Sequence, residues 1–591
     1  MANQKTLKSF TGSGAVRRRA WGFVFVLAAM ALLSFNASSA QQPPEIDNAL
    51  PCGRVGEVGD VAPGMALFRV DVNLNNFPDA ICNDGSGAVF YVRRYSNEAD
   101  RNKWHIHLQG GGSCQDGQSC AERWCSAGTN FGADKMSTTF RPLPTSIRGT
   151  GIFTPDPQRN NFAGWNHVLI YYCSSDTWSG TARNVQLSAT GPGGNTIQYR
   201  IHFEGANIVE AVIKMLQRLP GGQPVIYQNA ERENITMPDL DTATHVLFSG
   251  TSAGSGGVRH HADRLGQLLR RDNVQCQSGG NCPLVYRAVI DAGYGPKFED
   301  MNYTNFVGCL NAPFICSYTA LMQNQWTNVS MGLYKAQVDQ SCVEWHRTRQ
   351  PGTEWRCADL EHVMENHITT PYFVRADLQD ELKRRNYVET GFGTEDDYGR
   401  ATYNGLLALP NLDSFAEEGS VMSGGAALAA PGTFGPQCTQ HVGLTDNQAF
   451  FNVRVLSGGV SYSAHDVLWR WWTGQQPQQV VHPYTGPGPA PSCSSTPPTT
   501  GPIGFVGCSF SNNSVEGYHQ LGGQRFWDAI PTYNGGSVSV WAMNLTNTSR
   551  YWQGFHAALT ANSGTSTIWW QVCNSPSDDE NTLYQNARVV L

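Results

Sequence analysis

The 591-residue sequence is poor in charged residues and has no basic patch. Only 15% of its residues are charged, and the formal net charge is -7. Because lysine and arginine do not gather into a patch or stripe, we expect no nucleic-acid partner. Cysteine and histidine do not occur together at zinc-finger spacing, so we also expect no metal and no other cofactor.

The sequence also lacks an apolar run long enough to span a membrane at its amino end. The run from Trp21 to Phe35 is shorter than the roughly 20 residues that a span needs. A positive flank, Arg17 to Arg19, precedes it, and the small residues Ser38 to Ala40 follow. This order is typical of a signal peptide, so we expect residues 1–40 to be removed near Ala40 and the mature protein to be secreted or periplasmic. A retained anchor is the alternative, but we expect no stable membrane insertion.

All 16 cysteines follow the expected cleavage site. An even number of cysteines in an exported chain favours disulfides over free thiols. Local bridges would each stabilise the fold by about 2–4 kcal/mol, although the sequence leaves the connectivity open. Three close pairs lie in loop-like stretches: Cys276 with Cys282, Cys309 with Cys316, and Cys342 with Cys357.

The stretch from Thr244 to Arg264 predicts a strand, a sharp turn and a helix. Its apolar run Val246 to Phe248 leads into Gly250-Thr251-Ser252-Ala253-Gly254. A serine on such a turn projects its hydroxyl above the sheet edge, and flanking glycines remove the Cβ atoms that would clash there. Ser252 is therefore the candidate nucleophile. An ordinary glycine-rich turn is the alternative.

Further apolar runs predict strands over 88–94, 104–108, 167–172, 285–290 and 371–375, with a helix over 203–219. Strands that alternate with helices favour a mostly parallel α/β sheet. The strand over 104–108 ends in Gly110-Gly111-Gly112, whose main-chain N–H groups could form one side of an oxyanion hole. A flexible glycine loop is the alternative.

Two acids follow the strand over 371–375, namely Asp377 and Asp380, at a strand end where sites gather in open α/β sheets. His441 comes later, in a loop after Cys438. The chain order serine, aspartate, histidine is the one that α/β-hydrolases use. The other candidates are Asp291, which we interpret as tying down the turn over 293–295, and three histidines that we expect to be packing or surface residues. His260 and His261 are expected on the helix after the serine, and His465 before a Trp-rich helix.

Four stretches of this chain resemble the pectin acetylesterase and Notum carboxylesterase family, which are serine hydrolases with an α/β-hydrolase-like fold. They are GGGSC over 110–114, YYCSSDTWSG over 171–180, SGTSAGSGG around Ser252 and PYFVRADLQD over 371–380. Together they extend from about residue 88 to 472. The resemblance implies an α/β-hydrolase-like, mostly parallel sheet with helices on both faces.

The resemblance also implies the roles of individual residues. It makes Ser252 the nucleophile, His441 the base and Asp380, rather than Asp377, the acid. Backbone N–H groups of Gly111, Gly112 and Ala253 would bind the oxyanion. The substrate-pocket candidates are Ser113, Asp176, Trp178 and Thr251.

The sequence departs from the family pattern at two places. Ser113 stands where the family commonly has an aromatic residue beside the acyl pocket, which puts the size of the accepted acyl group in doubt. The turn itself reads GTSAGS where GSSAGG is usual. Trp178 could equally be a core residue.

These residues predict a serine carboxylesterase that works through an acyl-enzyme. The expected substrate is an acetylated polysaccharide such as pectin. The alternatives are a longer-chain acyl esterase of lipid or protein, and a binding protein that has kept the scaffold without activity.

Composition divides the chain into a signal peptide (1–40), an esterase domain (41–475), a Pro/Gly/Ser/Thr-rich linker (476–502) and a small carboxyl-terminal α/β unit (503–591). In that unit we expect strands over 505–509, 537–543 and 567–573 and helices over 514–521 and 551–559. The pattern resembles half of an SGNH-type hydrolase. Because Cys508 replaces the family's aspartate before Ser509 and no distal histidine block follows, we expect no second catalytic site.

Overall fold

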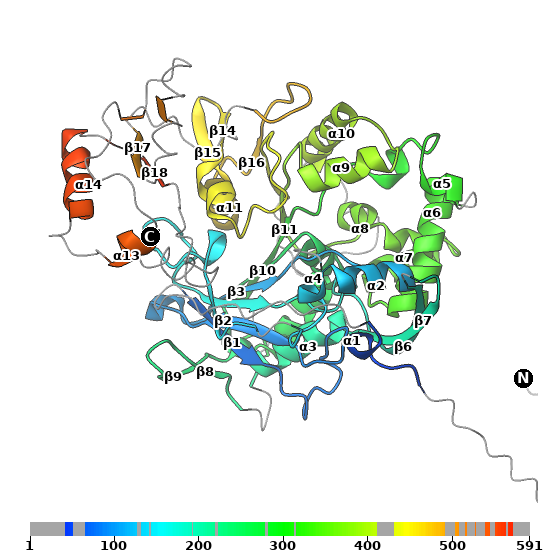
Figure 1. Cartoon of the computed structure of the whole chain (residues 1–591). Coiled ribbons are helices and arrows are strands. Elements are labelled where there is room, and N and C mark those ends of the chain that lie inside the picture. Colours follow the sequence, from blue (N-terminus) through cyan, green and yellow to red (C-terminus); the bar gives the residue numbers. More distant parts are fainter. Residues whose placement is uncertain are drawn as a thin grey trace, which may run out of the picture. The chain divides into compact units, whose positions relative to one another are not determined.

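The fold is seen in a computed structural model of the chain (Figure 1). It describes residues 42–50, 66–126, 132–140, 143–191, 193–218, 223–277, 282–311, 315–409 and 431–490, and short stretches between 503 and 570. The expected signal peptide, Cys508 and Ser509 lie outside the described residues.

A ten-stranded sheet organises the chain from β1 to β16, in the order β16-β13-β12-β11-β10-β3-β5-β2-β1-β4. Neighbours from β16 to β5 are parallel, and β2, β1 and β4 continue the sheet by antiparallel pairing. The expected mostly parallel α/β sheet is confirmed. The strands are β1 (Ala66–Asp71), β2 (Val89–Arg93), β3 (Lys103–Leu108), β4 (Ser146–Arg148), β5 (Asn166–Ile170), β10 (His245–Thr251), β11 (Val285–Asp291), β12 (Tyr372–Arg375), β13 (Gly432–Gly435) and β16 (Gln479–Val481).

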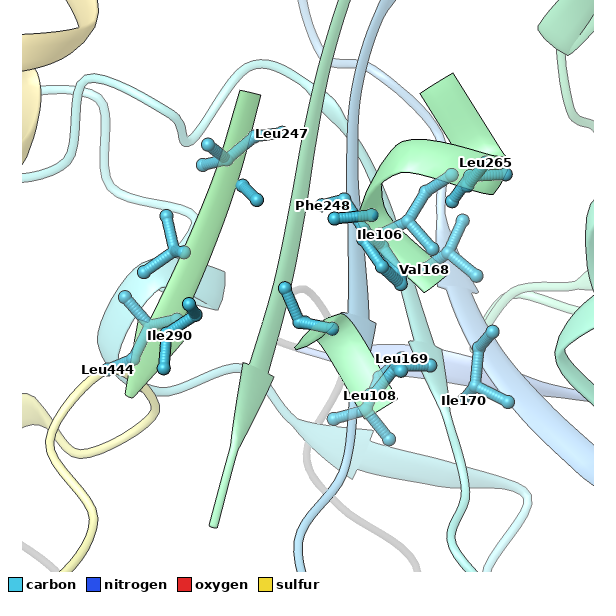
Figure 2. Packing of buried hydrophobic residues seen from close by; sticks show 14 of the residues in the cluster. Ile106, Leu108, Val168, Leu169, Ile170, Leu247, Phe248, Leu265, Ile290 and Leu444 are labelled. Atoms are coloured by element: carbon cyan, nitrogen blue, oxygen red, sulfur yellow. The ribbon is translucent and has the colours of Figure 1, made fainter. Parts of the chain in front are cut away.

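The central strands are buried on both faces, which is why they read as continuous apolar runs. Figure 2 shows Ile106, Phe248 and Ile290 from three strands of this core, with Leu265 from α4 (Ala253–Asp272) among the packed side chains. Burial of each such side chain contributes about 1.5–3 kcal/mol relative to exposure.

Helices cover both faces of the sheet. Tyr286 on β11 donates its hydroxyl to the carbonyl of Ala262 on α4, whereas its neighbour Arg287 donates to the carbonyl of Trp471 on α11 (Ala464–Thr473). Because successive side chains on a strand point to opposite faces, α4 and α11 lie on opposite sides.

The remaining elements surround this sheet. The predicted helix over 203–219 is α3, and Phe203 instead ends β7 of a hairpin that the sequence did not predict. The elements are α1 (Ile46–Ala49), α2 (Gly117–Cys125), β6 (Ala182–Thr190), β7 (Thr196–Phe203), α3 (Gly205–Leu216), β8 (Ile226–Gln228), β9 (Asn234–Thr236), α5 (Gly308–Asn311), α6 (Tyr318–Asn324), η7 (Gln325–Tyr334), α7 (Gln340–Arg349), η8 (Glu354–Ala358), α8 (Leu360–Asn366), α9 (Glu381–Glu389), α10 (Glu395–Ala408), β14 (Arg454–Ser457) and β15 (Val460–Ser463).

The expected linker starts too early at residue 476. Residues Gln479–Val481 form β16 and pair with β13 inside the main sheet. Beyond it, the side chain of Gln437 accepts from the N–H of Thr485 and donates to the carbonyls of Gly486 and Gly488. The stretch is rich in proline and glycine, but its main chain is tied to the segment after β13 as far as Ala490, whose N–H donates to the carbonyl of Gln437.

In the carboxyl-terminal unit, β17 (Ile503–Val506) and β18 (Thr567–Trp570) pair in parallel. The prediction of a strand over 537–543 is wrong, because Val538–Met543 forms helix α13. The buried ring of Trp541 packs against Tyr551 and Trp552 of α14 (Arg550–Ala561), so this segment packs as a helix on a helix.

The three close cysteine pairs form disulfides as expected. Cys82 is also bonded to Cys173, and Cys114 to Cys120. Among the described residues, no helix has both the length and the apolar character of a membrane span.

Candidate active site

Ser252 lies on a strained turn between β10 and α4. Its φ of +56° and ψ of -118° are rarely adopted by residues with a side chain. The turn packs closely against the end of β3. A Cβ on Gly254 would lie 2.0 Å from the Leu108 carbonyl oxygen, and one on Gly110 would lie 2.5 Å from that of Thr251. Glycine is therefore required at both positions for the serine to reach this place.

Ser252, His441 and Asp380 form a continuous hydrogen-bonded chain. The distance from His441 Nε2 to Ser252 Oγ is 2.9 Å, and that from His441 Nδ1 to Asp380 Oδ2 is 2.7 Å. Because a carboxylate only accepts, Nδ1 carries the proton, and Nε2 presents its lone pair to the serine hydroxyl. The arrangement is that of a nucleophile, a base and an orienting acid.

Asp380 has two functions, one through each carboxylate oxygen. Oδ1 accepts from the N–H groups of Leu382 and Lys383 and so caps α9, while Oδ2 holds His441. The helix cap therefore fixes the carboxylate that meets the imidazole. Asp377 pairs instead with Nη2 of buried Arg375 at 2.5 Å.

The other histidines considered from sequence contact different groups. His261 Nε2 lies 2.7 Å from the carbonyl of Trp178, and His465 Nε2 accepts from the N–H of Asn161. His260 is buried on α4.

The expected oxyanion donors differ in position. Ala253 begins α4, where helix N–H groups lack intrahelical acceptors. Gly111 lines the cavity beside Ser252. Buried Arg123 donates to its carbonyl and so holds the loop that follows β3. Gly112 has a φ of +73° and is not among the described residues that line this cavity. Of the three expected donors, Gly111 lines the cavity and Ala253 directly follows Ser252.

A cavity of about 590 Å³ opens beside Ser252 and His441. Apolar groups from β1, β4, β5 and nearby loops form part of its wall, including Leu67, Ile147, Phe153 and Leu169. Three cationic side chains also line it: Lys135, Arg148 and Arg385. Burial lowers the pKa of Lys135 to about 8, and its ammonium lies over the ring of Tyr171 at 4.5 Å from the centroid.

Of the four pocket candidates, Thr251 lines this cavity. Ser113 is exposed and pairs with Asp176 in an isolated bridge, outside the described lining. Asp176 and Trp178 are fully buried. The described lining of the cavity therefore includes none of these three residues: Ser113 faces solvent, and the turn over 174–180 places Asp176 and Trp178 in the interior.

Asp176 and Trp178 support the loop from behind. The carboxylate of Asp176 accepts from the N–H groups of Trp178, Gly180 and Gly205. Burial raises the pKa of Asp176 to about 6 despite these bonds. The indole of Trp178 donates to the carbonyl of Gln109, directly before the glycine run.

Sequence reasoning missed the role of Asp291. Its side chain is fully buried, and Oδ2 accepts from Thr251 Oγ1 and from the N–H groups of Gly443 and Leu444. Its carbonyl accepts from the N–H of Ser252. Asp291 therefore ties the turn that carries Ser252 to the loop that carries His441, rather than the turn over 293–295. Its place at the end of β11 was the available signal.

A second missed feature is a chain of buried polar groups beneath β10. His167 Nε2 lies 3.0 Å from the carbonyl of Phe162, so it donates and leaves Nδ1 as an acceptor for His105 Nδ1–H. His105 Nε2 then accepts from the Ser249 hydroxyl, which in turn accepts from His107 Nδ1–H. Burial lowers the pKa of His107 to about 3, so the ring is neutral and Nε2 is an acceptor. His107 lines the cavity.

Comparison with known proteins identifies the family. A family profile described as pectinacetylesterase matches residues 68–494. Among curated relatives, the palmitoleoyl-protein carboxylesterase NOTUM of Drosophila melanogaster is 28% identical over 312 residues, covering 51% of this chain and 36% of the relative. Palmitoleoyl-protein carboxylesterase notum1a of Danio rerio is 24% identical over 465 residues, covering 72% of this chain and 77% of the relative.

For the first two relatives, the match spans 36% and 63% of their length. Among solved structures, the Wnt deacylase Notum from Drosophila is 23% identical, with a TM-score of 0.49, and the match covers 72% of this chain and 99% of that one. Since the pectinacetylesterase profile extends over more than half of the sequence, this chain belongs to the pectinacetylesterase family.

Proposed function

We propose that the protein is a secreted serine carboxylesterase that removes O-acetyl groups from a polysaccharide. The observation that carries the proposal is the hydrogen-bonded chain from Ser252 Oγ through His441 to Asp380. Ser252 is the nucleophile, His441 the general base and Asp380 the orienting acid.

The reaction proceeds in two steps. Ser252 Oγ attacks the ester carbonyl while His441 Nε2 takes its proton, and the carbonyl oxygen becomes an oxyanion bound by N–H groups of Gly111 and Ala253, with Gly112 as a further donor. Collapse expels the alcohol, which receives the proton from His441. Water then attacks the acyl-enzyme by the same route in reverse and releases the acid. Each oxyanion donor contributes roughly 10²–10³ in rate.

The excess of cationic groups over the one carboxylate, Glu381, in the described lining of the cavity supports an anionic polymer as substrate. Lys135, Arg148 and Arg385 line the same cavity as Ser252. Carboxylates of a uronic-acid polysaccharide would pair with such groups, and the acceptor nitrogen of His107 suits a sugar hydroxyl. An acetylated pectin combines these features.

The apolar wall supports a second candidate, a longer-chain acyl esterase. Leu67, Ile147, Phe153 and Leu169 line a cavity of about 590 Å³, which is large for an acetyl group. The relatives are named palmitoleoyl-protein carboxylesterases.

Hydrolysis of p-nitrophenyl esters of increasing chain length, beside acetate release from acetylated pectins and xylans, tests both candidates. The acetylesterase proposal expects the highest kcat/KM on acetyl esters and acetate release from pectin. A maximum at long chains with no release from pectin supports the second candidate. Ser252→Ala should abolish hydrolysis, and Ser461→Ala, an exposed serine on β15, serves as its control. Equal activity of Ser252→Ala and wild type would contradict the mechanism, and no hydrolysis by wild type would favour a binding protein.

Export is the remaining part of the proposal, supported by the disulfides in the described residues. The mass of the protein recovered outside the cytoplasm should correspond to a chain that starts near Gln41. A mass that includes residues 1–40 would contradict cleavage.

A further inference from the structure

Three histidines converge outside the active-site cavity. His346 lies on α7, His362 on α8, and His367 immediately after α8. The distance between Nε2 of His346 and Nε2 of His362 is 2.9 Å, and that between Nε2 of His367 and Nε2 of His362 is 3.3 Å. Three ring nitrogens from two helices thus meet around one point. None of these residues lines the cavity beside Ser252.

This spacing is that of ligands around a tetrahedral metal ion. Zinc binds imidazole nitrogen at about 2.0–2.1 Å, which places two nitrogens of a tetrahedral site about 3.3 Å apart. The pairwise ring centroid distances of 5.1, 5.2 and 5.5 Å show that the three rings are arranged evenly around the same centre.

A hydrogen bond behind His346 prepares it as a ligand. Thr353 Oγ1 donates its only proton to the carbonyl of Gln350, so it accepts from His346 Nδ1, 2.7 Å away. Nε2 of His346 therefore carries a lone pair directed toward the other rings. This arrangement, in which a second residue fixes the tautomer of a histidine, is typical of metal sites.

Hydrogen bonding among the rings accounts for only part of the cluster. Asn366 Nδ2 lies 3.2 Å from His362 Nδ1, so without a metal His362 carries its proton on Nε2. That single proton faces Nε2 of both His346 and His367, and it can be shared but not given to both. A divalent cation at the centre would bind all three nitrogens. The proton of neutral His362 would then move from Nε2 to Nδ1, where the side-chain oxygen of Asn366 could accept it after rotation of the amide.

Cys342 does not supply a fourth ligand. Its sulfur lies within 4.8 Å of the histidine ligand atoms, but it is bonded to Cys357 and is no thiolate. The fourth position is left to solvent, which can reach the cluster through His362, since this side chain is half-buried while His346 and His367 are buried.

We propose that His346, His362 and His367 bind one zinc ion, which crosslinks α7 to α8. From the sequence we expected no metal, because the spacings of 16 and 5 residues match no zinc-finger pattern. The proposal departs from that expectation. The ion would take no part in the proposed ester hydrolysis, because none of its ligands lines the cavity beside Ser252.

Titration of ZnCl₂ into the full chain tests the site. The protein is freed of any polyhistidine tag, stripped with a chelator and dialysed, and binding is followed by calorimetry and by elemental analysis after gel filtration. We expect one zinc per chain and a higher Tm after zinc is added. His362→Gln should weaken binding by more than the roughly 10–100-fold that loss of an outer partner costs, and Thr353→Ala should weaken it within that range. His482→Gln, a histidine outside the cluster, should bind as wild type does.

The glutamine variant of His362 separates loss of zinc binding from loss of folding. His362 is half-buried, so its glutamine variant should retain the circular dichroism of wild type even if His346→Gln does not fold. Co²⁺ in place of zinc should give the visible absorption of a low-coordinate nitrogen site in wild type and lose it in His362→Gln. Binding of less than one tenth of an equivalent of zinc to wild type, or equal affinity of wild type and His362→Gln, would overturn the proposal. Because none of these measurements uses ester hydrolysis, failure of the zinc site and failure of the esterase proposal are separate outcomes.

Discussion

Asp291 shows how a single buried side chain can hold two catalytic loops together. It accepts from the hydroxyl of Thr251 and the N–H groups of Gly443 and Leu444, and Arg375 Nη1 approaches its other oxygen at 3.4 Å. Both carboxylate oxygens therefore face donors. An amide placed here would turn its NH₂ toward a donor in either orientation.

Asp291→Asn should therefore lower both stability and turnover. We expect the free energy of unfolding to fall by about 3 kcal/mol, because a buried hydrogen-bonded charge is lost. Without this carboxylate the loop that carries His441 is held less firmly. A displacement of a catalytic group by about 1 Å can lower the rate roughly 100-fold, so we expect kcat to fall by about that factor. Urea unfolding and p-nitrophenyl acetate hydrolysis measure the two effects. Asp446→Asn, in the same loop but bonded to the N–H of Ala449, is the control and should keep wild-type kcat. Matching kcat values for the two variants would contradict the positioning role.

Lys135 gives the proposed polysaccharide specificity a pH dependence. Burial lowers its pKa to about 8, so the side chain is cationic below that pH and neutral above it. If it pairs with a uronate carboxylate, KM for acetylated polygalacturonate should rise between pH 7 and 9, whereas KM for the neutral p-nitrophenyl acetate should not follow the same curve.

Substitutions separate this charge effect from a loss of packing. Lys135→Met should show the high KM for the polymer already at pH 7, and Lys135→Arg should keep the low KM up to pH 9, because guanidinium remains charged. An identical pH profile of KM for the polymer in wild type and Lys135→Met would exclude Lys135 from substrate binding.

At the scale of the element, β10 presents Ser252 at its carboxyl end and is anchored by Ser249 three residues earlier. The hydroxyl of Ser249 donates to His105 Nε2 at 2.7 Å and accepts from His107 Nδ1 at 2.8 Å. The strand before the proposed nucleophile is thus bonded to β3 by side chains as well as by the sheet ladder, and the glycine loop follows the end of β3.

Ser249→Ala should weaken this connection. Two buried ring nitrogens lose their partner, at about 1–3 kcal/mol for each unsatisfied group. The midpoint of urea unfolding should shift with an unchanged m-value, and Ser461→Ala should unfold as wild type does. A midpoint for Ser249→Ala equal to that of this control would mean that water replaces the hydroxyl.

Local patterns explain which elements could be predicted. Val246 to Phe248 and the glycine turn after them define a strand and an elbow within a few residues, and apolar runs located β3, β5, β11 and β12. The prediction for Val538–Met543 was wrong because the alternation of apolar and small polar residues there is typical of a strand. The packing of Trp541 against α14 favours a helix. Propensity was overridden by a tertiary contact.

Contacts between residues far apart in the chain could not be predicted from the sequence. His441 and Asp380 could be proposed through the family resemblance, but the bonds of Asp291 to residues 443 and 444 depend on which loops meet above β11. The same holds for His346, His362 and His367, which converge only because α7 packs beside α8. Neither set has a spacing that a pattern could detect.

At the scale of the whole molecule, the boundary of the esterase domain decides what the carboxyl-terminal unit contributes. β16 completes the sheet beside β13 through the pairs Thr433 with Gln479, Phe434 with Val480 and Gly435 with Val481. Directly after β13, Gln437 is held by residues 485–488, and the His441 loop follows. The Pro/Gly-rich stretch therefore supports the site up to about residue 490, whereas no described contact of the triad involves residues 503–570.

Two truncations of the chain beginning at Gln41 test this boundary. A chain that ends at Thr500 keeps β16 and the contacts of Gln437, so it should retain the kcat/KM of the full-length protein on p-nitrophenyl acetate and unfold at the same temperature. A chain that ends at Gln475 lacks β16, which leaves β13 as an unpaired edge and frees the segment before His441. It should lose activity and aggregate, as gel filtration and the ester assay would show. If the chain ending at Thr500 lost activity to the same extent, residues 501–591 would be part of the catalytic fold, and the division of the molecule into an esterase and an appended unit would be wrong.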